Sequence, residues 1–195
     1  EYLEGETLEG RLSHGPMPLE QALQRAVEIA GALDQAHRHG VIHRDLKPAN
    51  VMLTRSGVKL LDFGLAKVLE TPTAASTSLP TVSQTLTTQG TIMGTFQYMA
   101  PEQLEGAEAD ARSDIFALGA VVYEMLTGRK EFQGRSHAGL ISAIMSAEPP
   151  AIATLQPSVP PALEHVVRTC LAKDPQARWQ TAHDVMLQMR GMLEG

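Results

Sequence analysis

The feature that most constrains this chain is a polar loop enclosed by two apolar runs, at residues 41–53. It reads VIHRDLKPANVML. The apolar residues at both ends predict buried anchors, the second of them a short strand. Between these anchors, Asp45, Lys47 and Asn50 bring an acid, a base and an amide into six positions. Such groups are costly to desolvate unless they are paired or functional, so the loop predicts a site.

A second acidic residue, Asp62, follows the apolar run 58–61, which predicts another short strand. It opens the sequence DFG, and an APE sequence stands at residues 100–102. The sequences HRDLKPAN, DFG and APE, in this order, resemble the large carboxy-terminal lobe of a protein serine/threonine kinase. Three such motifs in one order are far more specific than any one of them alone.

The resemblance implies a fold class as well. We expect a mainly α, protein-kinase-like large lobe, which is helical with a few short β-strands beside the catalytic loop. The resemblance covers residues 1–195 and divides them into a hinge at 1–5, a catalytic loop at 41–50, an activation segment at 62–102 and a helical subdomain at 103–195. The glycine-rich loop and Val-Ala-Ile-Lys strand of the family are not found, so we expect the small β-rich N-lobe to be absent. The style of the motifs is similar to eukaryotic-like kinases of bacteria.

The catalytic roles come from the same resemblance. Asp45 is implied to accept the proton of the substrate hydroxyl, and Lys47 to stabilise charge on the transferred phosphate. Thr95, in GTFQYM, is implied to contact both. Asn50 and Asp62 are implied to ligate Mg2+, with Mn2+ as an alternative ion. Hard cations prefer such oxygen ligands and complete their shell with water and phosphate, so no all-protein metal cage is expected.

ATP is the implied nucleotide. Backbone groups near Glu1 and Leu3 would bind the adenine edge, Glu6 or Thr7 would reach the ribose, and Met52 would form part of the adenine floor. Without the resemblance, the first of these residues are only a strand end before a turn.

Regulation is expected in the segment before the APE sequence, which is rich in Ser, Thr, Ala and Pro and lacks apolar periodicity. Arg44 is available to pair with a phosphate on this segment through charge-assisted hydrogen bonds. Thr91 is the first candidate for that phosphate, and Thr87 and Thr88 are the next. The alternative is that the segment is a polar linker.

Four further residues are assigned structural roles. The resemblance implies that His43 packs near DFG and that Glu102 pairs with Arg178, nearly 80 positions away. Asp114 is expected to cap the helix that follows it, and the resemblance adds that it holds the backbone of the catalytic loop.

Apolar residues at helical spacing predict core helices at 19–39, 113–126 and 163–171. Gly40 and Gly128 are expected to end the first two. His37, at the end of the first helix, is expected to favour the negative helix terminus or solvent over a metal.

Composition limits the partners and the compartment. The chain has 16 basic and 22 acidic residues, a net charge of −6, which argues against non-specific binding of nucleic acid. Its one cysteine, Cys170, cannot form an internal disulfide and lies in an apolar setting, which predicts a buried thiol in a reducing compartment. The apolar run 115–126 is interrupted by Glu124 and is too short to cross a bilayer of about 30 Å. We expect a cytoplasmic chain without membrane contact, with anchoring of a longer parent left open.

The function implied is transfer of the γ-phosphate of ATP to Ser or Thr hydroxyls of protein substrates, self-phosphorylation in trans included. The piece on its own is expected to be inactive or a weak nucleotide binder. One alternative is a pseudokinase or scaffold, against which the intact Asp45, Lys47, Asn50 and Asp62 argue. The other is a kinase-like small-molecule phosphotransferase, which would lack the APE helix and its arginine partner.

Overall fold

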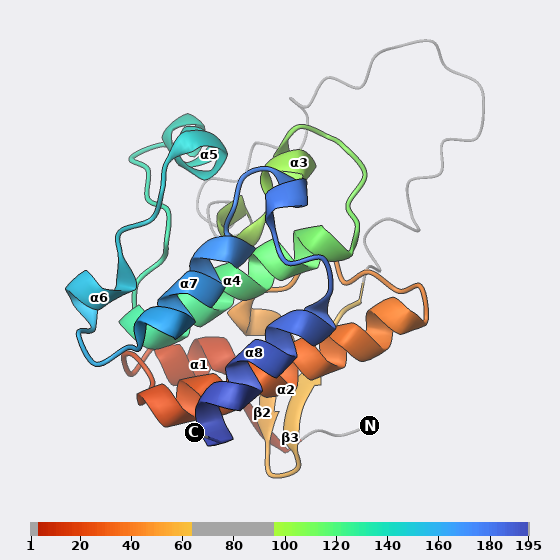
Figure 1. Ribbon diagram of the computed structural model, residues 1–195. Helices are drawn as coiled ribbons and strands as arrows, with labels where there is room; N and C mark the ends of the chain where they lie inside the picture. Colours follow the sequence, from red (N-terminus) through yellow and green to blue (C-terminus); the bar gives the residue numbers. More distant parts are fainter. Residues whose placement is uncertain (1–3, 64–95, 195) are drawn as a thin grey trace.

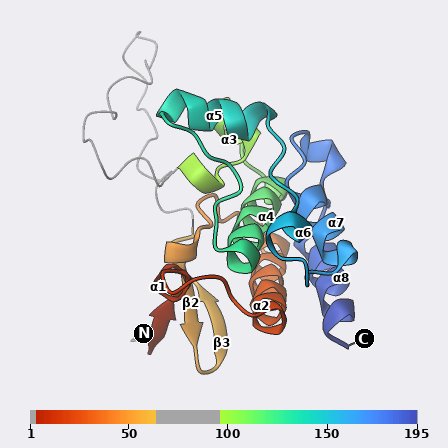
Figure 2. The ribbon, with the colours of Figure 1, turned by 90° about the vertical axis from the view of Figure 1, so that its left-hand side faces the viewer.

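The computed structural model describes residues 4–63 and 96–194 of the chain. In this part helices dominate, and a small sheet lies at one edge of the helical body (Figures 1 and 2). The predicted fold class, mainly helical with a few short strands, is therefore confirmed.

The sheet has three antiparallel strands in the order of the chain: β1 (Gly5–Thr7), β2 (Val51–Thr54) and β3 (Gly57–Leu60). β2 and β3 form a tight hairpin in which Val51 lies opposite Leu60. Both strands predicted after the polar loop are thus present, and the hairpin brings the loop end and the end of β3 together.

Three helices build the centre of the molecule: α2 (Leu19–Arg38), α4 (Ala111–Thr127) and α8 (Ala182–Glu194). α2 packs against both others, with α8 running alongside it (Figure 1). The predicted helix 19–39 ends one residue early, at a left-handed glycine turn in which Gly40 has a φ of 72°. The buried residues of α2 recur at helical spacing, as predicted: Ala22, Leu23, Ala26, Val27, Ile29, Ala30 and Leu33.

Helix α4 is apolar almost all round and is buried along most of its length. Its cap is not the one predicted from the sequence. Asp110, whose backbone is extended, caps the helix by accepting the Arg112 N–H at 2.8 Å. Asp114 lies inside the first turn, and its carboxylate accepts the N–H groups of His43 and Arg44 and not those of α4, so the capping prediction was wrong. The predicted stop is correct, because Gly128 ends the helix with a φ of 66°.

Shorter elements complete the body. Three one-turn 3-10 helices lie at Pro48–Asn50, Phe96–Tyr98 and Pro175–Ala177. The other helices are α1 (Leu8–Leu12), α3 (Pro101–Leu104), α5 (His137–Ser146), α6 (Ile152–Leu155) and α7 (Pro161–Cys170).

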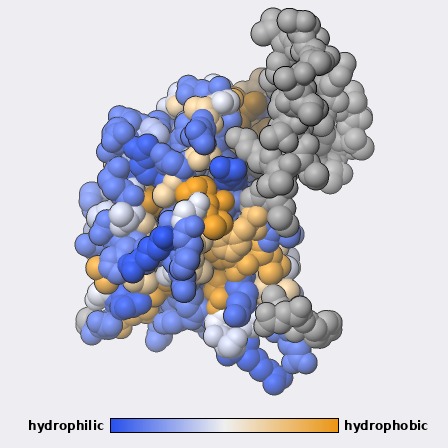
Figure 3. All heavy atoms as spheres, turned by 90° about the vertical axis from the view of Figure 1, so that its right-hand side faces the viewer, coloured by the Kyte–Doolittle hydropathy of each residue, from blue (hydrophilic) through white to orange (hydrophobic). Residues whose placement is uncertain are grey.

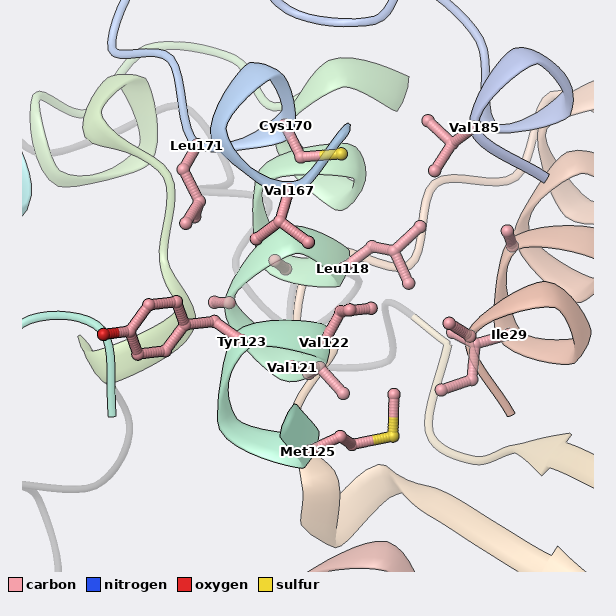
Figure 4. Packing of buried hydrophobic residues seen from close by; sticks show 14 of the residues in the cluster. Ile29, Leu118, Val121, Val122, Tyr123, Met125, Val167, Cys170, Leu171 and Val185 are labelled. Carbon is pink, nitrogen blue, oxygen red and sulfur yellow. The ribbon is translucent and has the colours of Figure 1, made fainter. Parts of the chain in front are cut away.

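The core is centred on α4, between α2 and α7 (Figure 4). Leu118 and Val122 lie between Ile29 on one side and Val167 on the other (Figure 4). Cys170 is fully buried beside them, as predicted, and burial raises the pKa of its thiol to about 12.

Close packing of α4 against the end of α7 depends on Gly119. A Cβ at this position would lie 2.6 Å from the Cβ of Cys170, a distance that no side chain can occupy without a shift.

The surface is mixed. Figure 3 shows apolar side chains gathered on the face at the right of Figure 1, with polar side chains around them. Within residues 4–63 and 96–194, no helix combines the length and apolar character that a membrane span requires.

Candidate active site

Only one of the two predicted anchors of the polar loop is buried: the second run begins at the buried Val51, whereas Val41, in the first run, is 43% exposed. Leu46 and Val51 are buried in the core, and the Pro48–Asn50 turn joins the loop to β2. Lys47 Nζ donates to Asp45 Oδ2 at 2.6 Å, and Asn50 Nδ2 donates to the same oxygen at 3.1 Å and to the Asp45 carbonyl at 2.9 Å. The acid, base and amide therefore form one cluster. The Asp45 side chain is 40% exposed, so a ligand can reach it.

The hairpin brings Asp62 to this cluster. The N–H of Leu61 donates to the carbonyl of Asn50 at 2.9 Å, one residue beyond the last strand pair. Asp62 follows directly, is exposed, and makes no hydrogen bond to another described residue. The backbone at Asp62 therefore lies close to that of Asn50.

Backbone strain marks the same two places. Arg44 and Asp62 are the non-glycine residues with positive φ in the described part, at 68° and 57°. Such conformations cost about 1–3 kcal/mol each and cluster at functional sites. No sequence pattern signalled them.

A buried carboxylate from α4 holds the loop from behind. Asp114 Oδ2 accepts the N–H of His43 at 2.8 Å, and Oδ1 accepts the N–H of Arg44 at 2.8 Å. His37 Nε2 lies 2.8 Å from Asp114 Oδ2, so the expectation that His37 serves the helix terminus or solvent was wrong. The reason is tertiary: the end of α2 lies against the start of α4.

His43 is buried between the loop and DFG. Its ring lies 4.6 Å from that of Phe63, centroid to centroid, and Nδ1 accepts the N–H of Asp45 at 3.4 Å. Burial lowers the pKa of His43, outweighing the opposite effect of the Asp114 carboxylate. The imidazole is therefore neutral near neutral pH and orients the backbone of Asp45.

A second buried ion pair joins α3 to the chain before α8. Arg178 donates to both oxygens of Glu102, at 2.7 and 2.8 Å, and to three backbone carbonyls. Ser113 Oγ donates to Glu102 Oε1 at 2.7 Å. Burial alone raises the pKa of Glu102, but these hydrogen bonds outweigh it and hold the pKa below its usual value. This bidentate pair spans 76 positions of sequence.

The residues expected at the nucleotide lie on the sheet. Thr7 and Met52 are paired across β1 and β2, and Glu6 is exposed beside them. The Thr7 hydroxyl already accepts the N–H of Gly10 at 3.1 Å and caps α1. Sequence reasoning did not anticipate this cap.

A hollow of about 900 Å³ lies near these strands, but none of the clustered loop residues lines it.

Six expected site residues lie outside the described part of the chain: Glu1, Leu3, Thr87, Thr88, Thr91 and Thr95. Arg44, which is expected to act with the three candidate phosphorylation sites, is half-buried next to Asp45.

The donors beside Asp45 suit a hard cation. Within the two described ranges, no group of three His, Cys, Asp or Glu side chains lies close enough to hold a metal. Both hydrogen bonds of the Asn50 amide leave from Nδ2, so its Oδ1 accepts none from the described residues. Mg2+ is usually held by one or two carboxylates, with waters and substrate phosphates. The amide oxygen of Asn50 and the carboxylate of Asp62 are the kinds of ligand that this ion takes.

Comparison with known proteins gives the class. The model of the protein kinase domain family matches residues 1–189, so the chain belongs to this family. Its relatives are bacterial serine/threonine-protein kinases. The chain is 38% identical over 197 residues to a probable serine/threonine-protein kinase of Streptomyces coelicolor, covering 100% of this chain and 28% of the relative. It is 36% identical over 187 residues to the serine/threonine-protein kinase PrkC of Bacillus subtilis, covering 95% of this chain and 27% of the relative.

A solved structure agrees. The kinase domain of PknI from M. tuberculosis superposes with a TM-score of 0.72 at 27% sequence identity, over 100% of this chain and 65% of that one. The chain thus spans less than a third of the length of these two curated relatives and about two thirds of this kinase domain.

Proposed function

We propose that the chain is the large-lobe part, residues 1–195, of a protein serine/threonine kinase that transfers the γ-phosphate of ATP to Ser or Thr hydroxyls of protein substrates. One observation carries the proposal: the Asp45 carboxylate is held by Lys47 and Asn50, and Asp62 follows the strand end whose backbone bonds to Asn50. Phosphoryl transfer depends mainly on positioning and charge neutralisation, which this cluster supplies.

Each loop side chain has a role in this scheme. Among the described residues, both hydrogen bonds to the Asp45 carboxylate go to Oδ2, and Oδ1 would orient the substrate hydroxyl and take its proton. The ammonium group of Lys47 has three donors, so it can hold Asp45 and contact a phosphate oxygen at the same time. Thr95 is the third group assigned to this contact.

ATP and Mg2+ are the cofactors proposed, as is general in the family, with Mn2+ as an alternative. Asn50 Oδ1 and the Asp62 carboxylate would hold the ion, which supplies charge neutralisation at the phosphates when bound. The hinge, residues 1–5, would bind the adenine through Glu1 and Leu3. Glu6 or Thr7 would reach the ribose, and Met52 would underlie the ring.

The activation segment, residues 62–102, is the proposed regulatory element. Arg44 would pair with a phosphate on Thr91, or on Thr87 or Thr88, added by self-phosphorylation in trans. The helical subdomain, residues 103–195, would support the site. We further propose that the longer protein acts in the cytoplasm, and that these 195 residues alone bind nucleotide weakly with negligible transfer.

Radiolabelled phosphate transfer tests the proposal. The longer natural protein that contains this chain is incubated with γ-labelled ATP, Mg2+ and peptides that carry Ser, Thr or Tyr. We expect label on Ser and Thr, and a loss of about a hundredfold or more in Asp62→Asn because the ion loses its carboxylate. Asp184→Asn, at an exposed acid on α8, is the matched control and retains the wild-type rate.

Two outcomes would contradict the proposal. Undiminished transfer by Asp62→Asn would remove the assigned ion site. Label on small alcohols but not on peptides would favour the small-molecule phosphotransferase, against which the buried Glu102–Arg178 pair already argues.

A further inference from the structure

The peptide group between Arg44 and Asp45 is held at both ends by side chains from distant parts of the chain. Its N–H, from Asp45, donates to His43 Nδ1 at 3.4 Å. Its carbonyl, from Arg44, accepts a hydrogen bond from Gln103 Nε2 at 3.0 Å. A peptide group is planar, so these two contacts fix its rotation and with it the direction in which the Asp45 side chain leaves the backbone.

The conformation held in this way is an unfavourable one. Arg44 has a φ of 68°, which an L-residue other than glycine rarely adopts and keeps only where its surroundings determine it. Asp114 fixes the N–H side of Arg44 at 2.8 Å, and Gln103 fixes its carbonyl side. Without Gln103, the Arg44 carbonyl would lose its hydrogen-bond donor. The Arg44 backbone could then relax toward a more favourable φ.

The other end of the Gln103 amide contacts the start of α3. Its Oε1 accepts the N–H of Ala100 at 3.0 Å, next to the Glu102 that is tied to Arg178. One amide thus joins the end of the activation segment to the residue before Asp45, 59 positions earlier in the sequence. An amide is suited to this, since it offers a donor and an acceptor at one position.

We infer that Gln103 is a positioning residue for phosphate transfer: its amide fixes the Arg44–Asp45 peptide against α3 and so orients the Asp45 carboxylate. The inference rests on the proposed function. Gln103 acts through the backbone of Asp45, so its loss should slow the chemical step and leave nucleotide binding unchanged.

Three substitutions in the longer natural protein separate the two ends of the amide. Gln103→Glu keeps an acceptor for Ala100 but places an oxygen against the Arg44 carbonyl. Gln103→Met keeps the length and removes both hydrogen bonds. Gln103→Lys restores a donor toward the carbonyl alone. Gln180→Glu is the matched control, because the Gln180 amide also donates to a backbone carbonyl, that of Arg178 at 2.7 Å, away from the cluster.

The measurement is steady-state peptide phosphorylation, with thermal melting of each variant to establish folding. We expect kcat to fall about tenfold or more in Gln103→Glu and Gln103→Met, with KM for ATP within about twofold of wild type. Gln103→Lys should recover part of kcat, and Gln180→Glu should match wild type. Wild-type kcat in both Gln103→Glu and Gln103→Met, or an equal loss in Gln180→Glu, would overturn the inference.

Failure of the proposed function itself gives a different result. The wild-type protein would then transfer no phosphate to any peptide, and the inference would fall with it. Failure of the inference alone leaves the wild type active.

Discussion

Asp114, in the first turn of α4, and Glu131, in the loop after its end, are both buried acids, but their surroundings differ completely. Asp114 is 1% exposed and accepts hydrogen bonds from two backbone N–H groups of the polar loop, with His37 beside it. Glu131 is 2% exposed, and neither carboxylate oxygen has a hydrogen-bond partner among the described residues. One carboxylate organises the candidate site, while the other is buried without a hydrogen-bond partner in the described part of the chain.

The pKa of Glu131 records the difference. Burial raises it to about 8, and the nearby Glu124 adds to the effect, while the residue's own backbone N–H, Lys130 and Gln97 offset only a part. The carboxyl group is therefore protonated at neutral pH. The buried carboxylate that positions the polar loop, Asp114, is stabilised by hydrogen bonds. The buried carboxyl of Glu131, which positions no part of the site, is protonated instead.

Removing the loop support should have the largest effect. In Asp114→Ala, the N–H groups of His43 and Arg44 lose their acceptor in a buried setting, at about 1–3 kcal/mol each. We expect the free energy of unfolding to fall by about 3–5 kcal/mol. Urea denaturation followed by circular dichroism measures this loss. A loss below about 1 kcal/mol would mean that Asp114 is not a main support of the polar loop.

The Glu102–Arg178 pair should come next. In Arg178→Met the buried Glu102 loses its bidentate partner, which should lower the free energy of unfolding by about 3 kcal/mol at neutral pH. The pKa of Glu102 is below 4.5 in the folded chain and close to 4.5 in the unfolded chain. Its contribution is thus complete above about pH 4.5 and disappears as the pH falls further.

Urea titrations between pH 3 and pH 7 test this pH dependence. The difference between wild type and Arg178→Met should shrink toward the acid end. A difference that is constant with pH would mean that the pair stabilises through packing and not through charge.

Neutralising Glu131 should stabilise the chain by a smaller amount. Its pKa is about 8 in the folded chain against 4.5 in the unfolded chain, so unfolding releases a proton between these values. Wild-type stability therefore falls as the pH rises through this window, at up to about 1.4 kcal/mol per unit. Glu131→Gln has no such proton.

We expect the advantage of Glu131→Gln over wild type to grow by about 2 kcal/mol from pH 5 to pH 7 and to grow further by pH 8. Melting temperatures at these three pH values give the answer. A destabilised variant would mean that the Glu131 carboxylate has a partner that stabilises its charge.

The smallest effect is expected at an exposed pair. Arg168 donates to Glu148 at 2.9 Å, but the side chains are 58% and 80% exposed. Glu148→Gln should change the free energy of unfolding by less than about 0.5 kcal/mol, and 0.5 M salt should remove most of that. A loss above 1 kcal/mol would show that removing even an exposed carboxylate destabilises this chain. The effect of Asp114→Ala could then not be attributed to the loss of its buried hydrogen bonds.

Local patterns in the sequence predicted the positions of the long helices and the close approach of residues within the polar loop. Helical spacing placed α2 and α4 within one or two residues, and Gly128 was correctly expected to end α4. The polar loop was correctly expected to bring Asp45 and Asn50 together, since they are joined by a short turn.

The distant contacts that were expected, Glu102 with Arg178 and Asp114 with the loop backbone, came from the family resemblance, and others were missed. His37 and Asp114 are 77 positions apart, and Gln103 and Arg44 are 59 apart, so neither contact leaves a local signal. The positive φ of Arg44 is set by these same contacts and could not be predicted from its residue type. Asp114 was misassigned as a cap because an acid in a first helical turn looks the same whether it faces the helix end or a neighbouring loop.

The most direct test compares three carboxylates in one assay. Peptide phosphorylation by the longer natural protein is measured for Asp45→Asn, Asp114→Asn and Glu131→Gln, with folding checked for each. The account predicts a loss of about a hundredfold or more for Asp45→Asn, a smaller loss for Asp114→Asn, and the wild-type rate for Glu131→Gln. Wild-type transfer by Asp45→Asn would contradict it.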